Sequence, residues 1–145
     1  MSPPASERRV LFVCTHNAGR TIVAAALLNA AHQPPGVRAD SARTDPSDAL
    51  NPTVVTALAE RGISLAGVSP KPITTELLAG ADLVVTMSRH PTGPALSSGV
   101  GSQQHWQLDF PGDDLEAMRT FCIEVDRRVQ ALLADLPRQR GDGQH

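Results

Sequence analysis

A short apolar run, a compact loop and an alanine-rich stretch follow one another near the amino terminus, and this succession constrains the fold most. Residues 9–13 form a nearly continuous apolar run that ends at Cys14, which is typical of a strand buried on both faces of a parallel sheet. Residues 21–31 are rich in alanine and apolar nearly all round, as expected for a helix packed tightly on a sheet. The order strand, loop, helix indicates an α/β protein.

Five further elements are expected along the chain. In order they are a strand over 37–41, a helix over 52–61, a short helix between Thr74 and Gly80, a strand over 82–87 and a long amphipathic helix from Asp113. Segment 88–104 has no clear period, and the residues from 138 onward are expected to fray. Because strands that alternate with helices are joined by right-handed crossovers, we predict a doubly wound α/β fold with a sheet covered on both faces.

Three polar residues are placed to cap helices. Asn51 precedes a proline, which is favoured at the first helical position. Thr74 precedes the short helix, and Asp113 is expected to cap the last helix with Glu116 as its capping-box partner. Gly62 sits where the first of these three helices should end.

The composition excludes several classes of protein. At 145 residues, with 41% hydrophobic and 19% charged residues, the chain fits one globular domain over 1–145, with an ordered core over about 8–136 between a polar amino-terminal lead and a carboxyl-terminal tail. A net charge of -2 gives no basic surface, so we expect no nucleic-acid partner. No apolar stretch approaches the roughly 20 residues that span a bilayer, and no signal-peptide pattern is present, so we expect a cytoplasmic protein without membrane contact.

The chain has two cysteines, Cys14 and Cys122. A reducing compartment favours free thiols for both. Cys122 falls on the apolar stripe of the last helix, so we expect it to pack in the core rather than to act as a resolving thiol. His90 and His105 have no partner at metal-ligand spacing, so no metal site is expected.

The segment from Cys14 to Arg20 has the chemistry of an anion cradle. A short loop that runs into the first turn of a helix aims backbone N–H groups and the positive end of the helix dipole inward. Gly19 permits tight backbone conformations, and the small side chain of Ala18 leaves room for the loop to surround the anion. Arg20 offers a planar fork that fits two oxygens of phosphate, arsenate or sulfate. The predicted oxyanion-binding residues are therefore Thr15, His16, Asn17, Ala18, Gly19 and Arg20.

The backbone N–H groups of this loop, the helix dipole and Arg20 also act on Cys14. A thiol at a helix N-terminus beside an arginine has a lowered pKa, typically about 3.5–7.5, so we expect Cys14 to be a thiolate at neutral pH. The Thr21 hydroxyl can donate to this sulfur, Asn17 can brace the loop, and His16 can contact the anion or orient the loop. The alternative is that Cys14 is only a small buried residue at the end of a strand.

At these residues the chain resembles the low-molecular-weight tyrosine phosphatase family, and more narrowly its arsenate reductase branch. Residues 10–17, Val-Leu-Phe-Val-Cys-Thr-His-Asn, resemble an arsenate reductase opening, whereas the phosphatases usually carry a Gly-Asn pair after the nucleophile. The resemblance implies a three-layer sandwich with a central parallel sheet of about four strands and no bound cofactor. It covers about 8–136 and continues through Asp40-Ser41-Ala42, Asn51-Pro52, Glu60-Arg61-Gly62-Ile63, Pro70-Lys71, Ala81-Asp82-Leu83-Val84-Val85-Thr86-Met87 and Trp106-Gln107-Leu108.

Two departures from the family pattern bear on catalysis. Thioredoxin-coupled arsenate reductases carry a redox cysteine pair just after the strand that ends in Thr-Met, and here residues 88–92 contain no cysteine. The general acid of the family is an Asp before a Pro, and here Phe110 takes that place while Asp109 lies one residue earlier. Asp109 is therefore the candidate acid, with Asp113 and Asp114 as possible substitutes.

The function implied by the resemblance is arsenate reduction. Cys14 would attack arsenate bound in the loop from Cys14 to Arg20, and an external thiol would complete the reduction to arsenite. The expected partners are a small oxyanion substrate and a thiol-redox partner, which would be mycothiol, glutathione or a thioredoxin system. Two alternatives stay open: a phosphatase that hydrolyses phosphomonoesters through a Cys14 phosphoenzyme, and an oxyanion-binding module with weak catalysis.

Overall fold

The computed structural model describes residues 8–14, 20–31, 37–43, 51–65, 73–88, 102–109, 111 and 114–143. These ranges hold the following elements in chain order: β1 (Arg8–Cys14), α1 (Arg20–Ala31), β2 (Val37–Arg43), α2 (Pro52–Glu60), α3 (Thr75–Gly80), β3 (Leu83–Ser88), β4 (Ser102–Gln107) and α4 (Leu115–Gly143). The predicted oxyanion loop over 15–19 lies outside the described residues.

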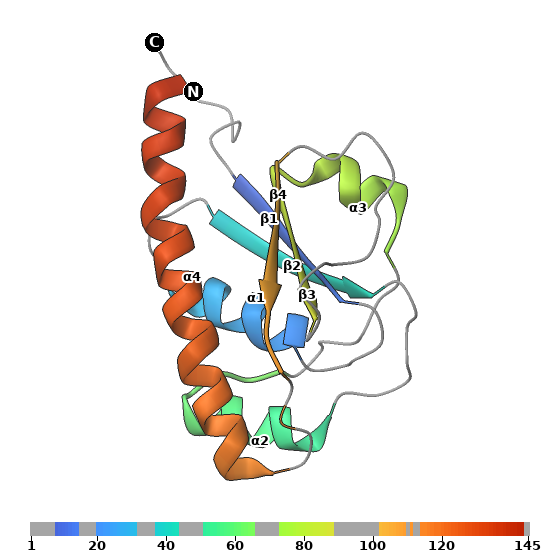
Figure 1. Cartoon of the computed structure of the whole chain (residues 1–145), viewed down its shortest axis with the longest axis vertical. Helices are drawn as coiled ribbons and strands as arrows, with labels where there is room; N and C mark the ends of the chain where they lie inside the picture. Colours follow the sequence, from blue (N-terminus) through green and yellow to red (C-terminus); the bar gives the residue numbers. More distant parts are fainter. Residues whose placement is uncertain are drawn as a thin grey trace.

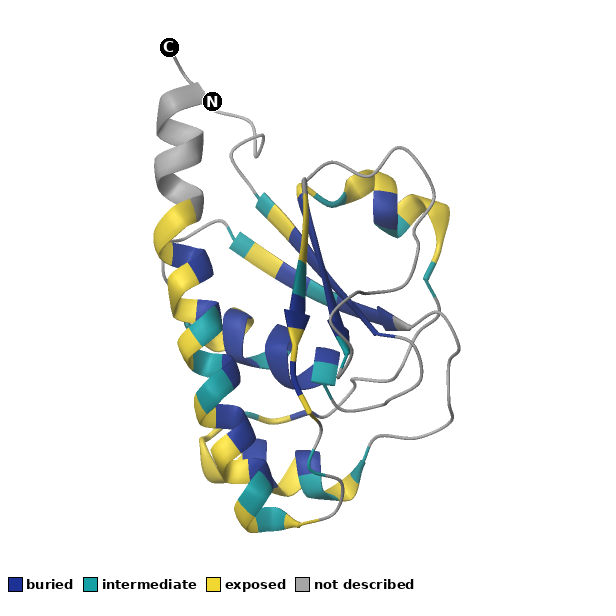
Figure 2. Ribbon diagram, in the orientation of Figure 1, coloured by how far each residue is buried: buried dark blue, intermediate teal, exposed yellow. Residues whose placement is uncertain are grey.

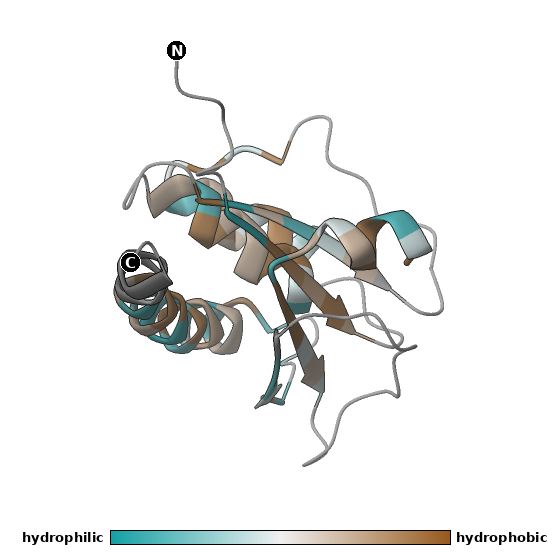
Figure 3. Cartoon of the chain, turned by 90° about the horizontal axis from the view of Figure 1, so that it is seen from above, coloured by the Kyte–Doolittle hydropathy of each residue, from teal (hydrophilic) through white to brown (hydrophobic). Residues whose placement is uncertain are grey.

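The four strands form one parallel sheet in the order β2-β1-β3-β4 (Figure 1). One face shares the larger apolar core with α1, α2 and α4, and the other face shares a smaller core with α3. Figure 3 shows α4 and α3 on opposite sides of the strands. The predicted doubly wound α/β sandwich with a central parallel sheet of four strands is thus confirmed.

The central strand β1 is buried on both of its faces. Val10 and Phe12 contribute to the larger core, while Leu11 and Val13 contribute to the smaller one. All four are at most 2% exposed, and Figure 2 shows most of this strand in the buried colour. The ring of Phe12 packs against that of Trp106, with the centroids 5.5 Å apart. Since full burial of one such side chain stabilises a fold by roughly 1.5–3 kcal/mol, this strand anchors both layers.

Most predicted elements are confirmed with small shifts at their ends. Asn51 caps α2, because its Oδ1 accepts a hydrogen bond from the backbone N–H of Thr53 at 2.8 Å. Thr74 caps α3 in the same way, with its Oγ1 3.1 Å from the backbone nitrogen of Leu77. Gly62, with φ of +80°, follows the end of α2 as expected, because glycine adopts this left-handed conformation without strain.

The sequence pattern did not indicate β4, which begins inside segment 88–104. This strand is polar apart from Trp106 and lies at the edge of the sheet. Gln103 and Gln104 are exposed, whereas Trp106 is buried. An edge strand is often polar because this discourages pairing with other chains, so the apolar signal of a buried strand is missing here.

The ends of α4 also differ from the prediction. Its cap is Asp114 rather than Asp113, since Asp114 Oδ1 accepts from the backbone N–H groups of Glu116 and Ala117 at 3.0 and 3.3 Å. The helix extends to Gly143 and so passes residue 138, from which the chain was expected to fray. The apolar periodicity that predicted the helix fades before this point, which explains the early limit.

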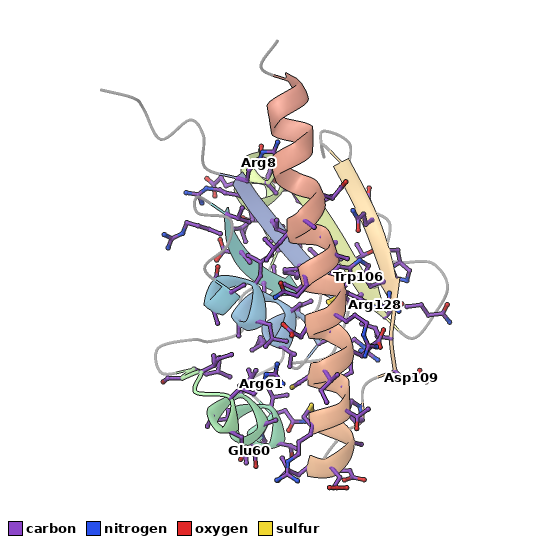
Figure 4. The ribbon with its side chains drawn as sticks, turned by 90° about the vertical axis from the view of Figure 1, so that its left-hand side faces the viewer. Arg8, Glu60, Arg61, Trp106, Asp109 and Arg128 are labelled. Atoms are coloured by element: carbon purple, nitrogen blue, oxygen red, sulfur yellow. The ribbon has the colours of Figure 1, made fainter. Side chains whose placement is uncertain are left out.

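Ion pairs join α2 to α4. Arg119 donates to the two carboxylate oxygens of Glu60 at 2.9 and 2.8 Å, and Arg61 lies 3.6 Å from Asp126. Figure 4 labels Glu60 and Arg61, the α2-side members of these pairs. The hydrogen bond from Arg119 lowers the pKa of Glu60. Because the Arg119 and Glu60 side chains are 46% and 40% exposed, their pairing orients the helices more than it stabilises them.

Asn29 of α1 closes the outer edge of β2. Its Nδ2 donates to the carbonyl of Ala39 at 3.1 Å, and its Oδ1 accepts from the N–H of Ala39 at 2.9 Å. The side-chain amide thereby takes the place of a neighbouring strand at this residue. These two bonds join α1 to the sheet edge.

Replacing Asn29 with Ala should lower the free energy of unfolding by about 1–3 kcal/mol, because both backbone groups of Ala39 lose their partner. Urea unfolding followed by circular dichroism measures this change. Ala30→Gln, at an exposed position of the same helix, is the control and should change the free energy by less than about 0.5 kcal/mol. Equal stability of Asn29→Ala and the wild type would contradict the role given to the amide.

Candidate active site

Cys14 is the last residue of β1 and lies at the carboxyl edge of the sheet. In the register of the sheet it pairs with Met87 of β3, and Met87 pairs with Trp106 of β4. Helix α1 begins at Arg20, so its N-terminus, which carries a partial positive charge, follows this strand end closely in the chain. In open α/β folds this edge is where ligands bind.

The structure describes part of the predicted site. The residues that it describes are Cys14, Arg20, Thr21 and Asp109. Those that lie outside the described residues are Thr15, His16, Asn17, Ala18 and Gly19. The roles assigned to the second group stay predictions.

Cys14 and Thr21 lie together at the start of α1. The Sγ of Cys14 is 3.7 Å from the Oγ1 of Thr21, and either atom can be the donor of this hydrogen bond. Both residues are at most 1% exposed. If Cys14 is a thiolate, the hydroxyl must donate, because a thiolate has no proton to give. The contact predicted between these two side chains is therefore present.

Arg20 reaches from the first turn of α1 to the end of β4. Its Nε donates to the carbonyl oxygen of Leu108 at 2.9 Å. This bond fixes the plane of the guanidinium, because Nε and the two terminal nitrogens share one plane. In this conformation an oxyanion would meet the terminal nitrogens of Arg20 rather than the Nε side of the fork.

Leu108 was not among the residues predicted for the site. Its backbone N–H donates to the carbonyl of Ser88 at 2.7 Å, which continues the pairing of β3 with β4 beyond the last strand residue. The position of Arg20 thus depends on Leu108, the residue at which the chain leaves β4 and which we call the exit of β4. The sequence signal for this segment was the Trp-x-Leu stretch of the family resemblance, which did not reveal a contact with an arginine 88 residues away.

Of the two candidate acids that the structure describes, Asp109 and Asp114, Asp109 is the one next to the site. It follows Leu108 directly and is exposed, and Figure 4 shows it at the end of β4. Asp114 caps α4 through its carboxylate, so this group is engaged at the start of that helix. Asp113 lies outside the part of the chain that the structure describes, as does Phe110 in the usual place of the acid.

Cys122 packs in the larger core, as predicted, and is 1% exposed. Both cysteines are free thiols. Burial raises the pKa of the Cys122 thiol, and the positive charge of Arg61 offsets part of this effect. Cys122 is thereby kept neutral, whereas Cys14 lies beside a hydroxyl and a helix N-terminus.

The ranges that the structure describes contain neither a candidate metal site nor a candidate membrane span. Within these ranges no three His, Cys, Asp or Glu side chains are grouped so that they could hold a metal ion. Among the same residues, no helix combines the length and apolar character needed to cross a membrane.

The fold and the site together define an α/β protein with a thiol and a guanidinium at its first strand–helix junction. The model of the low molecular weight phosphotyrosine protein phosphatase family matches residues 9–141, and the chain belongs to this family. A Halobacterium salinarum protein named "Putative arsenate reductase" is 28% identical over 123 residues, which cover 81% of this chain and 85% of the relative.

Solved structures of both arsenate reductases and phosphatases are similar to this chain. A thioredoxin-dependent arsenate reductase of Corynebacterium glutamicum has a TM-score of 0.73 and 30% identity over 92% of this chain, which spans 63% of that protein. An arsenate reductase of Archaeoglobus fulgidus has a TM-score of 0.74 and 30% identity, covering 87% of this chain and 99% of its own. The arginine phosphatase YwlE of Geobacillus stearothermophilus has a TM-score of 0.72 and 26% identity, covering 95% and 98%.

The two cysteines should differ in their reaction with iodoacetamide. In the folded Cys14→Ser variant, whose remaining thiol is Cys122, alkylation should be at least ~10³-fold slower than in denaturant, because burial protects this thiol until the chain opens. Cys14 is as buried as Cys122, so in Cys122→Ala only its thiolate state is expected to make it react faster at pH 7 than Cys122 does. Mass spectrometry over time measures both rates. Fast labelling of Cys122 in the folded protein would contradict its burial.

Proposed function

We propose that this chain reduces arsenate to arsenite, with Cys14 as the nucleophile and an external thiol as the reductant. The observation that carries the proposal is the position of Cys14 at the carboxyl end of β1, with the Thr21 hydroxyl 3.7 Å from its sulfur. Arg20 begins the helix beside it and supplies the cation that an oxyanion needs. The similarity to proteins named as arsenate reductases supports the choice of substrate.

The first step joins Cys14 to arsenic. The thiolate attacks the arsenic of arsenate, an S–As bond forms, and one As–O bond breaks. The departing oxygen takes up protons and leaves as water, so arsenic remains As(V). Arg20 and the backbone of loop 15–19 hold the other oxygens, and Thr21 stabilises the sulfur anion before the attack. Asp109 is the proposed proton donor, because it follows the carbonyl that Arg20 binds.

The second step reduces arsenic. An external thiolate attacks the Sγ of Cys14 and forms a mixed disulfide, and the electron pair of the S–As bond passes to arsenic. Arsenic becomes As(III) and leaves as arsenite. A second external thiol then exchanges with the mixed disulfide and returns Cys14 to the thiolate.

The reductant is proposed to be external because the chain offers no suitable second thiol. Cys122 is the other cysteine of the sequence, and it is buried in the core with a raised pKa. Ser88 ends β3, directly after the residue that pairs with Cys14. A hydroxyl there cannot form a disulfide. Mycothiol with mycoredoxin, glutathione with glutaredoxin, and thioredoxin are the candidate systems.

The alternative function is phosphomonoester hydrolysis. The similarity to the arginine phosphatase and the family to which the chain belongs favour this candidate. Its first step would be the same attack on phosphorus, after which water would hydrolyse the phosphocysteine. An oxyanion-binding module with weak catalysis is the third possibility.

Steady-state arsenite production distinguishes these functions. Purified protein should convert arsenate to arsenite with at least one of the three thiol systems, each supplied separately, and Cys14→Ser should reduce the rate to the background. Aryl phosphate hydrolysis is measured in parallel on the same samples. Phosphate release without arsenite would support the phosphatase, and silence in both assays would support the binding module.

Thr21→Val should lower kcat/KM for arsenate about 3- to 10-fold, the value of one hydrogen bond to the sulfur. Because the lost donor stabilises the thiolate, the pKa of Cys14 should rise, and the acidic limb of the pH profile should move to higher pH. Thr21→Ser keeps the hydroxyl and is the matched control. An unchanged profile in Thr21→Val would show that the hydroxyl does not act on the thiolate.

A further inference from the structure

A polar cluster lies on the face of the sheet opposite to the larger core, at the carboxyl ends of β3 and β4. His105 Nδ1 is 2.7 Å from Thr86 Oγ1, and His105 Nε2 is 3.4 Å from Ser88 Oγ. The neighbouring residue Trp106 points into the larger core with Phe12, so His105 faces the other way. Thr86 is 1% exposed, whereas Ser88 and His105 are half-buried, so the cluster lies at the margin of the interior.

The hydrogen bonds of Thr86 favour one tautomer of the neutral imidazole. The Thr86 hydroxyl donates to the carbonyl of Gln104 at 3.3 Å, and a carbonyl can only accept. If the single hydroxyl proton is used in this bond, His105 Nδ1 is the donor to Thr86. Nε2 is then the acceptor, and the Ser88 hydroxyl donates to it.

Ser88 connects this cluster to the candidate active site. The backbone carbonyl of Ser88 accepts from Leu108, and the carbonyl of Leu108 accepts from Arg20 Nε, at 2.7 and 2.9 Å. His105 therefore contacts the side chain of Ser88, and the backbone carbonyl of Ser88 binds Leu108, the first residue after β4. A shift of this exit would displace the acceptor that fixes the guanidinium plane.

We infer that His105 is a positioning residue for oxyanion binding: it fixes Ser88, and through the Ser88–Leu108 backbone bond it aligns the guanidinium of Arg20. The inference rests on the proposed oxyanion site and extends it to the opposite face of the sheet. His105 is expected to act on the affinity for the anion, because Arg20 is the group that it aligns.

The test measures the Kd of the full-length protein for inorganic phosphate by isothermal titration calorimetry, beside its melting temperature. Phosphate is a suitable probe because it has the shape and charge of arsenate and requires no thiol. His105→Phe keeps an aromatic ring and removes both hydrogen bonds, so it should weaken phosphate binding roughly 10- to 100-fold. With arsenate as substrate, KM should rise more than kcat falls. Gln103→Ala, at an exposed position of the same strand, should bind phosphate like the wild type.

Conservative variants separate positioning from stability. His105→Gln can place an amide near the Nε2 position and keep the bond to Ser88, so its Kd should lie closer to the wild-type value than that of His105→Phe. If His105→Phe does not fold, Ser88→Ala removes the same link and should weaken binding about 3- to 10-fold. A lower melting temperature with an unchanged phosphate Kd in these variants would overturn the inference. Absence of phosphate binding by the wild type would instead overturn the proposed function, and the inference with it.

Discussion

The burial of β1 on both faces is the constraint on which the candidate site depends. This strand has a hydrogen-bonded neighbour on each side and an apolar core on each face, so its backbone has little freedom to move. Cys14 is the last residue of this buried strand, and α1 begins at Arg20, six residues later in the chain. A nucleophile needs a fixed position relative to its substrate, and a doubly buried strand provides one.

The hydrogen bond from Arg20 to Leu108 adds a second constraint, because it ties the first strand–helix unit to the last strand. β1 and β4 are not neighbours in the sheet, since β3 lies between them. Arg20 bridges this distance, and the pairing of Leu108 with Ser88 holds the acceptor in place. The thiol and the cation of the site are therefore oriented by different parts of the sheet. This division explains why residues on β3 and β4 bear on a site whose predicted residues belong mostly to one loop.

The sequence predicted those features that follow from local patterns. The apolar run that became β1, the alanine-rich helix α1 and the caps at Asn51 and Thr74 each have a signal within a few residues. The family resemblance added the number of strands. β4 was not predicted, because an edge strand rich in glutamine carries no apolar alternation. The cap of α4 was predicted one residue too early, because two aspartates are adjacent. The contact between Arg20 and Leu108 could not be predicted, since it joins residues that are close only after the sheet has formed.

The displaced acid bears more heavily on ester hydrolysis than on arsenate reduction. The bridging oxygen of a phosphate ester carries no proton, so its departure benefits from a well-placed acid, typically by about 10²–10⁴-fold. Arsenate carries ionisable oxygens of its own, and a proton can pass between them to the oxygen that departs. With Phe110 in the usual place of the acid and Asp109 one residue earlier, the same thiolate and arginine would lose more as a phosphatase than as a reductase. The chemistry of the leaving group thus favours arsenate independently of the similarity to other proteins.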